Sequence, residues 1–210
     1  MPRNEYPLHQ LQHFLPEGSY PMVAHYLQRY QVHLTVTRER KSVLGDYRHA
    51  FRGRNHRISV NGNLNPYAFL ITLVHELAHL VTFVQFGNRV AAHGREWKDI
   101  YGILLKEFLG KQFFPPDVEA TLYKSLHNLP ASSCSDENLM RILRKYDHPD
   151  RRTMTVEELP EGTVFAIDGG RIFQKGKKLR KRYQCKELGT GKTYLFSGLY
   201  EVVATNLNGD

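Results

Sequence analysis

The chemistry of this chain is concentrated in the segment His75-Glu76-Leu77-Ala78-His79. Residues four apart share one face of a helix, so both imidazoles can reach one tetrahedral zinc ion while Glu76 projects beside them. Zinc polarises a carbonyl group and acidifies a water molecule, and a neighbouring carboxylate can take the proton of that water. The segment therefore predicts hydrolysis of a peptide or a related amide, with Glu76 as the general base.

A catalytic zinc ion needs a third protein ligand and one open position. The candidates that follow the motif are His93, Glu96 and Asp99. We favour His93, because Gly94 lets the chain turn sharply beside the metal. Glu96 is the alternative, since a glutamate on a later helix is the third ligand in another large class of zinc peptidases. If Glu96 does not bind the metal, we expect its negative charge to complement the positive N-terminal end of its own helix. We expect one zinc ion per chain.

The motif needs a helix to hold it, and the surrounding residues predict one between Pro66 and Gly87. Apolar residues recur there at helical spacing: Leu70, Leu73, Val74, Leu77, Val81 and Val84. A second helix is predicted from Arg95 to about Gly110, before Pro115 and Pro116. Its apolar stripe comprises Trp97, Ile100, Tyr101, Leu104, Leu105 and Phe108. We expect this stripe to pack against the motif helix.

The remaining elements complete an α+β fold. A helix is predicted to begin at Ser19 and Pro21, and β-like segments span residues 33–37 and 56–61, with 43–48 as a possible third. We expect a small antiparallel sheet against the helices, as in zincin-like metallopeptidase domains. Two further helices are predicted at 118–126 and 139–146.

The character of the sequence changes after Pro149, where short β-type runs alternate with glycines. These runs cover residues 163–167, 171–174, 178–187, 192–196 and 200–205. We expect a small all-β module of the SH3-like or OB-like type. The predicted organisation is a metallopeptidase domain (1–130), a helical linker (131–155) and a basic β-rich module (156–210).

The most basic part of that module is residues 171–186, with eight basic and no acidic residues. If residues 178–186 form one strand, alternation places four cations on one side: Lys178, Arg180, Arg182 and Lys186. Nearby aromatic residues could stack on single-stranded bases. We therefore predict nucleic-acid contact here, with a solvated face that prevents strand aggregation as the alternative.

Composition limits the possible classes of protein. A formal charge of +8 and an isoelectric point near 9.5 favour polyanions as partners. Only two cysteines are present, Cys134 and Cys185, which is too few for a disulfide framework or a four-cysteine zinc site. The N-terminus has no apolar run typical of a leader, and no stretch reaches the roughly 20 apolar residues of a membrane span. We expect a cytoplasmic protein with no membrane partner, with nucleoid association as a further possibility.

The paired motifs resemble those of the SprT-like family, which includes bacterial SprT proteins and the eukaryotic protease Spartan. The resemblance rests on residues 75–79, a 13-residue gap, and then His93-Gly94-Arg95-Glu96-Trp97. Leu44-Gly45-Asp46-Tyr47-Arg48 also looks like the family's lead-in to its metal helix. The match covers roughly residues 15 to 110 and implies zinc on His75, His79 and His93 with Glu76 catalytic. SprT proteins commonly carry a multi-cysteine zinc ribbon after this domain, and this chain departs from that pattern.

Two classes of function follow from these observations. The first is a zinc metalloprotease that cleaves proteins bound or crosslinked to DNA, as the family resemblance implies. The second is a nucleic-acid-associated adaptor that binds zinc with little or no proteolytic activity. An intact Glu76 favours the first, since a structural zinc ion does not need it. A hydrolase of a non-protein amide is a third interpretation. Three tyrosines are candidates for donating a hydrogen bond to the transition state near the zinc ion: Tyr47, Tyr67 and Tyr101.

Overall fold

The computed structural model describes residues 8–40, 43–126, 136–148, 153–167 and 169–204. The chain forms two compact units, Met1–Asp147 and His148–Asp210. Cys134, one of the two cysteines, lies outside the described residues.

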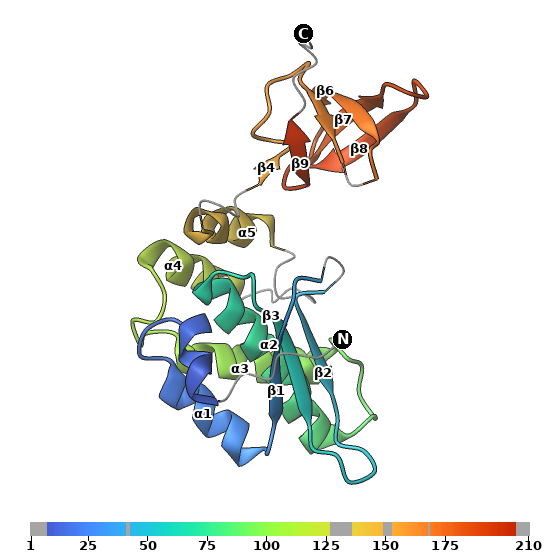
Figure 1. The fold of residues 1–210 in the computed structure, drawn as a ribbon. Coiled ribbons are helices and arrows are strands. Elements are labelled where there is room, and N and C mark those ends of the chain that lie inside the picture. The colour runs from blue at the N-terminus through green and yellow to red at the C-terminus, as the bar shows by residue number, and fades with distance from the viewer. Residues whose placement is uncertain (1–7, 41–42, 127–135, 149–152, 168, 205–210) are drawn as a thin grey trace. The chain divides into compact units, whose positions relative to one another are not determined.

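The N-terminal unit contains a three-stranded sheet of order β1-β3-β2 (Figure 1). Its strands are β1 (His33–Thr37), β2 (Gly45–Arg48) and β3 (Arg57–Asn61). β2 and β3 form an antiparallel hairpin, whereas β1 pairs with β3 in parallel, with Val36 opposite Val60. The prediction of an antiparallel sheet was therefore wrong for β1. The connection after β1 passes the position that β3 later takes, and β2 forms on its far side. The β2-β3 hairpin then returns the chain between β1 and β2, so β3 runs in the same direction as β1.

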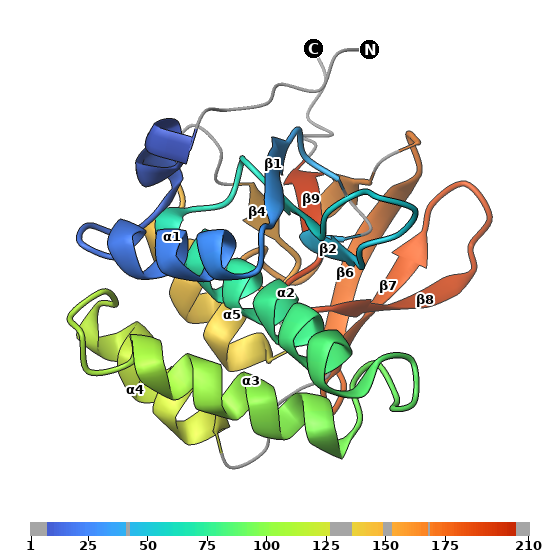
Figure 2. The ribbon, with the colours of Figure 1, turned by 90° about the horizontal axis from the view of Figure 1, so that it is seen from below.

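Helix α2 (Pro66–Phe86) is the central element of this unit. The Asn65 side chain caps its first turn by accepting a hydrogen bond from the Ala68 amide (3.0 Å), and Gly87 ends it with φ of 62°. Figure 2 shows α2 between the sheet and α3 (Arg95–Phe108). α2 is long and apolar enough to cross a membrane, but 78% of its most apolar stretch is buried inside the protein, as in the core helix of a soluble fold.

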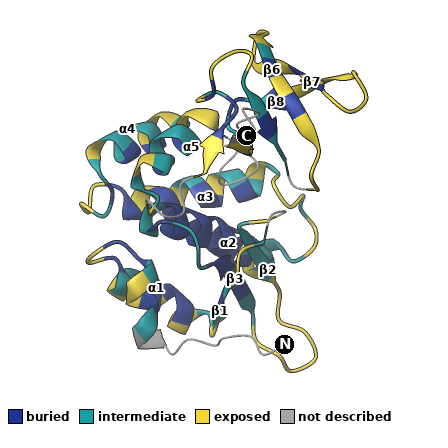
Figure 3. Ribbon diagram, turned by 45° about the horizontal axis from the view of Figure 1, so that its top comes forward, coloured by how far each residue is buried: buried dark blue, intermediate teal, exposed yellow. Residues whose placement is uncertain are grey.

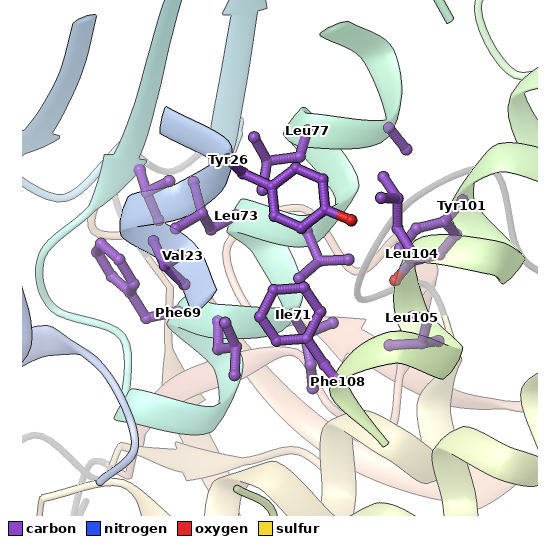
Figure 4. Close-up of a cluster of buried hydrophobic side chains, with 14 of the residues drawn as sticks. Val23, Tyr26, Phe69, Ile71, Leu73, Leu77, Tyr101, Leu104, Leu105 and Phe108 are labelled. Carbon is purple, nitrogen blue, oxygen red and sulfur yellow. The ribbon is translucent and has the colours of Figure 1, made fainter. Parts of the chain in front are cut away.

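Further helices complete the N-terminal unit. They are η1 (Leu8–Phe14), α1 (Tyr20–Arg29), α4 (Pro116–Ser125), α5 (Glu137–Leu143) and η2 (Arg144–Tyr146). Side chains of α1, α2 and α3 interlock in the core, including Val23, Phe69, Leu73 and Leu105 (Figure 4). α2 is buried along almost its whole length, whereas α4 and α5 each expose one side (Figure 3).

Helix α5 belongs to this core. Leu139 and Leu143 are each 3% exposed within the same apolar cluster as α2. The Asn65 amide nitrogen donates hydrogen bonds to the Leu143 carbonyl (2.9 Å) and to an Asp147 carboxylate oxygen (2.7 Å). The segment predicted as a helical linker thus includes residues that brace the N-terminus of the motif helix.

The C-terminal unit is an all-β sheet of order β4-β9-β5-β6-β7-β8. Its strands are β4 (Met154–Thr155), β5 (Val164–Ala166), β6 (Ile172–Lys178), β7 (Arg182–Glu187), β8 (Thr193–Ser197) and β9 (Glu201–Ala204). All its pairings are antiparallel among the described strands. Phe165 and Phe173, both fully buried, centre a small core of its own. The SH3-like or OB-like type stays a prediction.

Candidate metal centre

Three histidine side chains converge between α2 and the start of α3. The Nε2 atom of His75 lies 3.2 Å from that of His79 and 3.4 Å from that of His93. Among the described residues, these three form the one group of His, Cys, Asp or Glu side chains that could hold a metal ion. His75 and His79 are brought together by their spacing of four on α2, and His93 comes from the loop before α3.

The three nitrogens fit a tetrahedral metal ion. With zinc-to-nitrogen distances of 2.0–2.1 Å, two ligands of a regular tetrahedron lie about 3.3–3.4 Å apart, close to the two separations observed here. Imidazole nitrogens suit zinc and several other transition metals. Three ligands leave a fourth tetrahedral position, as a catalytic zinc ion requires. The geometry therefore supports a metal site.

Trp97 fixes the positions of the three histidines. Its indole is fully buried, and its ring centroid lies 4.7 Å from His75, 5.2 Å from His79 and 4.7 Å from His93. Because Trp97 stands in the first turn of α3, packing of α3 on α2 also sets the place of His93. The helical spacing predicted Trp97 as part of the apolar stripe but gave no signal for this supporting role.

The histidines are held in their neutral form. Burial, followed by the neighbouring imidazoles, lowers the pKa of His75 to about 3. Burial and His93 lower the pKa of His79 to about 4, and burial lowers that of His93 as well. Neutral imidazole is the form that binds a metal. The Nδ1 atom of His75 is buried without a hydrogen-bond partner, so Trp97 and its other neighbours orient this ring by packing.

Glu76 is buried beside strand β2. Its side chain is 6% exposed, and a Cβ atom built on Gly45 would stand 2.6 Å from its Oε1 atom. Burial raises the pKa of Glu76 to about 8; Asp46 adds to the rise and Arg40 opposes it. A divalent cation on the adjacent histidines would favour the charged carboxylate and lower this pKa. Burial of an ionisable group in an apolar helix is typical of a catalytic base.

The alternative third ligands lie outside the cluster. Glu96 is not part of the three-histidine group, and its Oε2 atom faces Gly94 at the first turn of α3. Asp99 is paired with Arg95 at 3.8 Å. His93 therefore stays our proposed third ligand.

The three candidate tyrosines have different surroundings. Tyr101 stacks on Trp97 with centroids 5.0 Å apart and lies 5.5 Å from the His75 ring. The Tyr47 hydroxyl is hydrogen-bonded to His56 Nδ1 at 2.8 Å. Tyr67 packs against Tyr146 near the start of α2, two turns before His75. Tyr101 is thus the tyrosine that the structure brings to the histidine cluster.

The proposed nucleic-acid residues are divided between two strands and a turn. Lys178 ends β6, Arg180 lies in the turn, and only Arg182 and Lys186 belong to β7. The expectation of one strand over residues 178–186 was wrong, because the Leu179 amide donates to the Arg182 carbonyl (2.7 Å) and closes a hairpin.

Two of the basic residues in this run are used internally. The Arg171 guanidinium is paired with Glu187 at 2.6 Å. Lys175 is 5% exposed and donates its ammonium protons to the backbone carbonyls of Glu157 and Leu159. Arg182 and Lys186 remain exposed on one side of β7, whereas Lys178 lies opposite Tyr183 on the other.

Comparison with known families matches residues 9–118 to the SprT-like family. The matched region contains the motif helix, His93 and all three strands of the first sheet. It covers just over half of the chain, which therefore belongs to the SprT-like family. No curated protein and no solved structure matches the chain.

Proposed function

We propose that this protein is a zinc-dependent metalloprotease that acts on proteins bound or crosslinked to DNA. The observation that carries the proposal is the convergence of His75, His79 and His93 on one point, with an open fourth position, next to the buried carboxyl of Glu76. Membership of the SprT-like family supports it. The zinc ion would act as a Lewis acid toward the substrate carbonyl and the attacking water.

The chain's own groups would then perform the proton transfers. Glu76 accepts the proton of the attacking water at a carboxylate oxygen and later gives a proton to the leaving amine. Burial raises its pKa in the metal-free protein, and a cation on the histidines would favour the charged carboxylate that accepts this proton. The three neutral histidines hold the metal without competing for that proton.

DNA as the location of the substrate is supported by charge. The chain carries 29 basic and 21 acidic residues, and Arg182 and Lys186 project together from the C-terminal sheet. Attachment of enzyme and substrate to the same polyanion would raise their effective concentration. This would let a protease of low intrinsic affinity select proteins that are bound to DNA.

The test is cleavage of a DNA-binding protein by the purified chain, with and without DNA. Zinc-loaded protein should cleave it faster when DNA is added, chelation should abolish cleavage, and zinc should restore it. Zinc binding with no cleavage under any condition would instead favour a nucleic-acid-associated adaptor. Cleavage of a small amide with none of a protein would favour a hydrolase of non-protein amides.

A further inference from the structure

The face of the three-stranded sheet that points away from α2 is polar and basic. Side chains alternate along a strand, so in β2 Gly45 and Tyr47 face α2 while Asp46 and Arg48 face the other way. The outer face is hollowed by a depression of about 740 Å³, comparable in volume to ligand sites. Its polar lining includes Thr35, Thr37 and Ser59.

Four arginines line this depression: Arg40, Arg48, Arg54 and Arg57. Asp46 is the one acidic residue among its described lining, and it pairs with Arg48 at 2.8 Å. Arg54 and Arg57 have no acidic partner within the described ranges, and the Nε atom of Arg57 is buried without a hydrogen-bond partner. The depression is therefore a site for an anion.

Arg40 is fixed in place by neutral groups. Its Nε atom donates to Asn61 Oδ1 at 2.8 Å, and one of its terminal nitrogens donates to Ser59 Oγ at 3.0 Å. These partners orient the guanidinium, and no carboxylate of the described residues forms an ion pair with it, although its charge lowers the pKa of the nearby Glu76 carboxyl. Fixed guanidinium groups bind phosphate well, because their planar donors match two of its oxygens and little side-chain freedom is lost.

The turn between β2 and β3 adds an aromatic ring to this surface. Phe51 and Arg54 exchange two backbone hydrogen bonds of 3.1 Å around Arg52 and Gly53, whose φ angles are both positive. This is a tight hairpin turn, and directly paired residues project to the same side of a hairpin. Phe51 is 61% exposed, and the guanidinium carbon of Arg52 lies 5.1 Å from the centroid of its ring, so the ring is open to solvent beside a cation.

The sequence around the turn is basic over a longer stretch. Residues 48–57 hold four arginines, two histidines and no acidic residue. Several separated cations suit a ligand with repeated negative charges better than a single phosphate. An exposed aromatic ring among them suits a ligand with stackable bases, which an acidic peptide lacks.

We infer that the outer face of the β1-β3-β2 sheet binds single-stranded nucleic acid, with phosphates on Arg54 and Arg57 and a base stacked on Phe51. This surface belongs to the N-terminal unit and is distinct from the basic residues of the C-terminal sheet. Strand β2 connects it to the metal centre: Gly45 contacts Glu76 from one side of the strand, while Asp46 lies in the depression on the other. Nucleic acid would thus be held within the metallopeptidase unit itself.

The test measures binding of the full chain to a labelled 20-nucleotide single strand over a range of salt concentrations. Arg54→Glu with Arg57→Glu should weaken binding at least about tenfold and reduce the slope of log affinity against log salt by about 1.4. Lys106→Glu with Lys124→Glu is the control, since it changes the net charge equally at exposed sites of α3 and α4. Phe51→Ala should weaken binding at least about fivefold with the slope unchanged. Its control is Ile103→Ala, which removes an equally exposed apolar side chain.

Retained zinc and an unchanged unfolding temperature would show that each variant folds. Equal effects of the arginine pair and the lysine pair would overturn the inference, as would an unaltered affinity of Phe51→Ala. The inference would also be overturned if the arginine substitutions weakened the binding of a polyglutamate peptide but left the binding of the oligonucleotide unchanged. Only binding is measured, so these results do not depend on whether the protein proves to be a protease.

Discussion

Gly45 and Glu76 lie so close together that no side chain fits between them: a Cβ atom at position 45 would stand 2.6 Å from Glu76 Oε1 and 2.8 Å from its Cγ atom. It would also stand 2.8 Å from a methyl carbon of Thr72. Gly45 therefore allows β2 to approach α2 closely enough to bury the proposed base. Gly45 does not have a positive φ angle, so its backbone conformation does not require glycine. The close contacts with Glu76 and Thr72 require it.

Gly45→Ala should lower proteolytic activity at least about tenfold while one zinc ion stays bound, since the added methyl must displace the Glu76 carboxylate or β2. Zinc content, thermal unfolding and cleavage rate would be measured together. Gly189→Ala is the control, because a Cβ there meets nothing within 4 Å. Full activity of Gly45→Ala would show that the position of Glu76 is not critical.

Substitution of the ligands should separate His93 from Glu96. His75→Ala and His79→Ala should lose zinc, and His93→Ala should weaken zinc binding at least about a hundredfold, whereas Glu96→Ala should bind within about threefold of the unaltered protein. A chelator competition assay measures all four. If Glu96→Ala loses the metal and His93→Ala keeps it, the third ligand is wrongly assigned.

Zinc affinity should depend only weakly on pH between 7 and 5.5. A proton competes with zinc for each imidazole only below the pKa of that imidazole in the folded metal-free protein, and burial lowers this pKa to about 3 for His75 and about 4 for His79. The affinity should therefore fall less than about tenfold over this range. Three ordinary histidines with pKa near 6.5 would lose about several hundredfold, and such a loss would contradict the account.

The C-terminal cations should contribute to nucleic-acid affinity separately from the metal. Changing Arg180, Arg182 and Lys186 together to Glu should reduce the slope of log affinity against log salt by roughly two to three, at about 0.7–0.9 per phosphate contact. Zinc should stay bound, and cleavage of a free peptide should be unchanged while cleavage of a DNA-bound protein falls. An unaltered salt dependence would identify these residues as a solvated face.

The elements with strong local signals were predictable from the sequence. α2 follows from Pro66 at its start, Gly87 at its end and the apolar residues between them. The convergence of His75 and His79 follows from their spacing alone. His93 was the favoured third ligand among the candidates that follow the motif, and the structure brings this residue to the cluster.

Features that depend on contacts distant in sequence were not predictable in the same way. Strand periodicity is the same in parallel and antiparallel pairs, so the pairing of β1 with β3 gave no signal. The turn at Leu179–Arg182 contains no Gly, Pro, Asn or Asp, so nothing local divided the basic run into two strands. The need for glycine at position 45 arises only when Glu76 is brought against it in the folded chain.

The most direct test of the central claim is the cleavage rate of Glu76→Gln, measured on protein whose zinc content is determined in the same sample. Glutamine keeps the size of the side chain but cannot accept the proton of the attacking water, so one zinc ion per chain should remain while the rate falls at least about a hundredfold. Glu96→Gln, which changes the same charge beside the site, should retain most of the activity. A loss of less than about tenfold in zinc-loaded Glu76→Gln would contradict general-base catalysis by this residue.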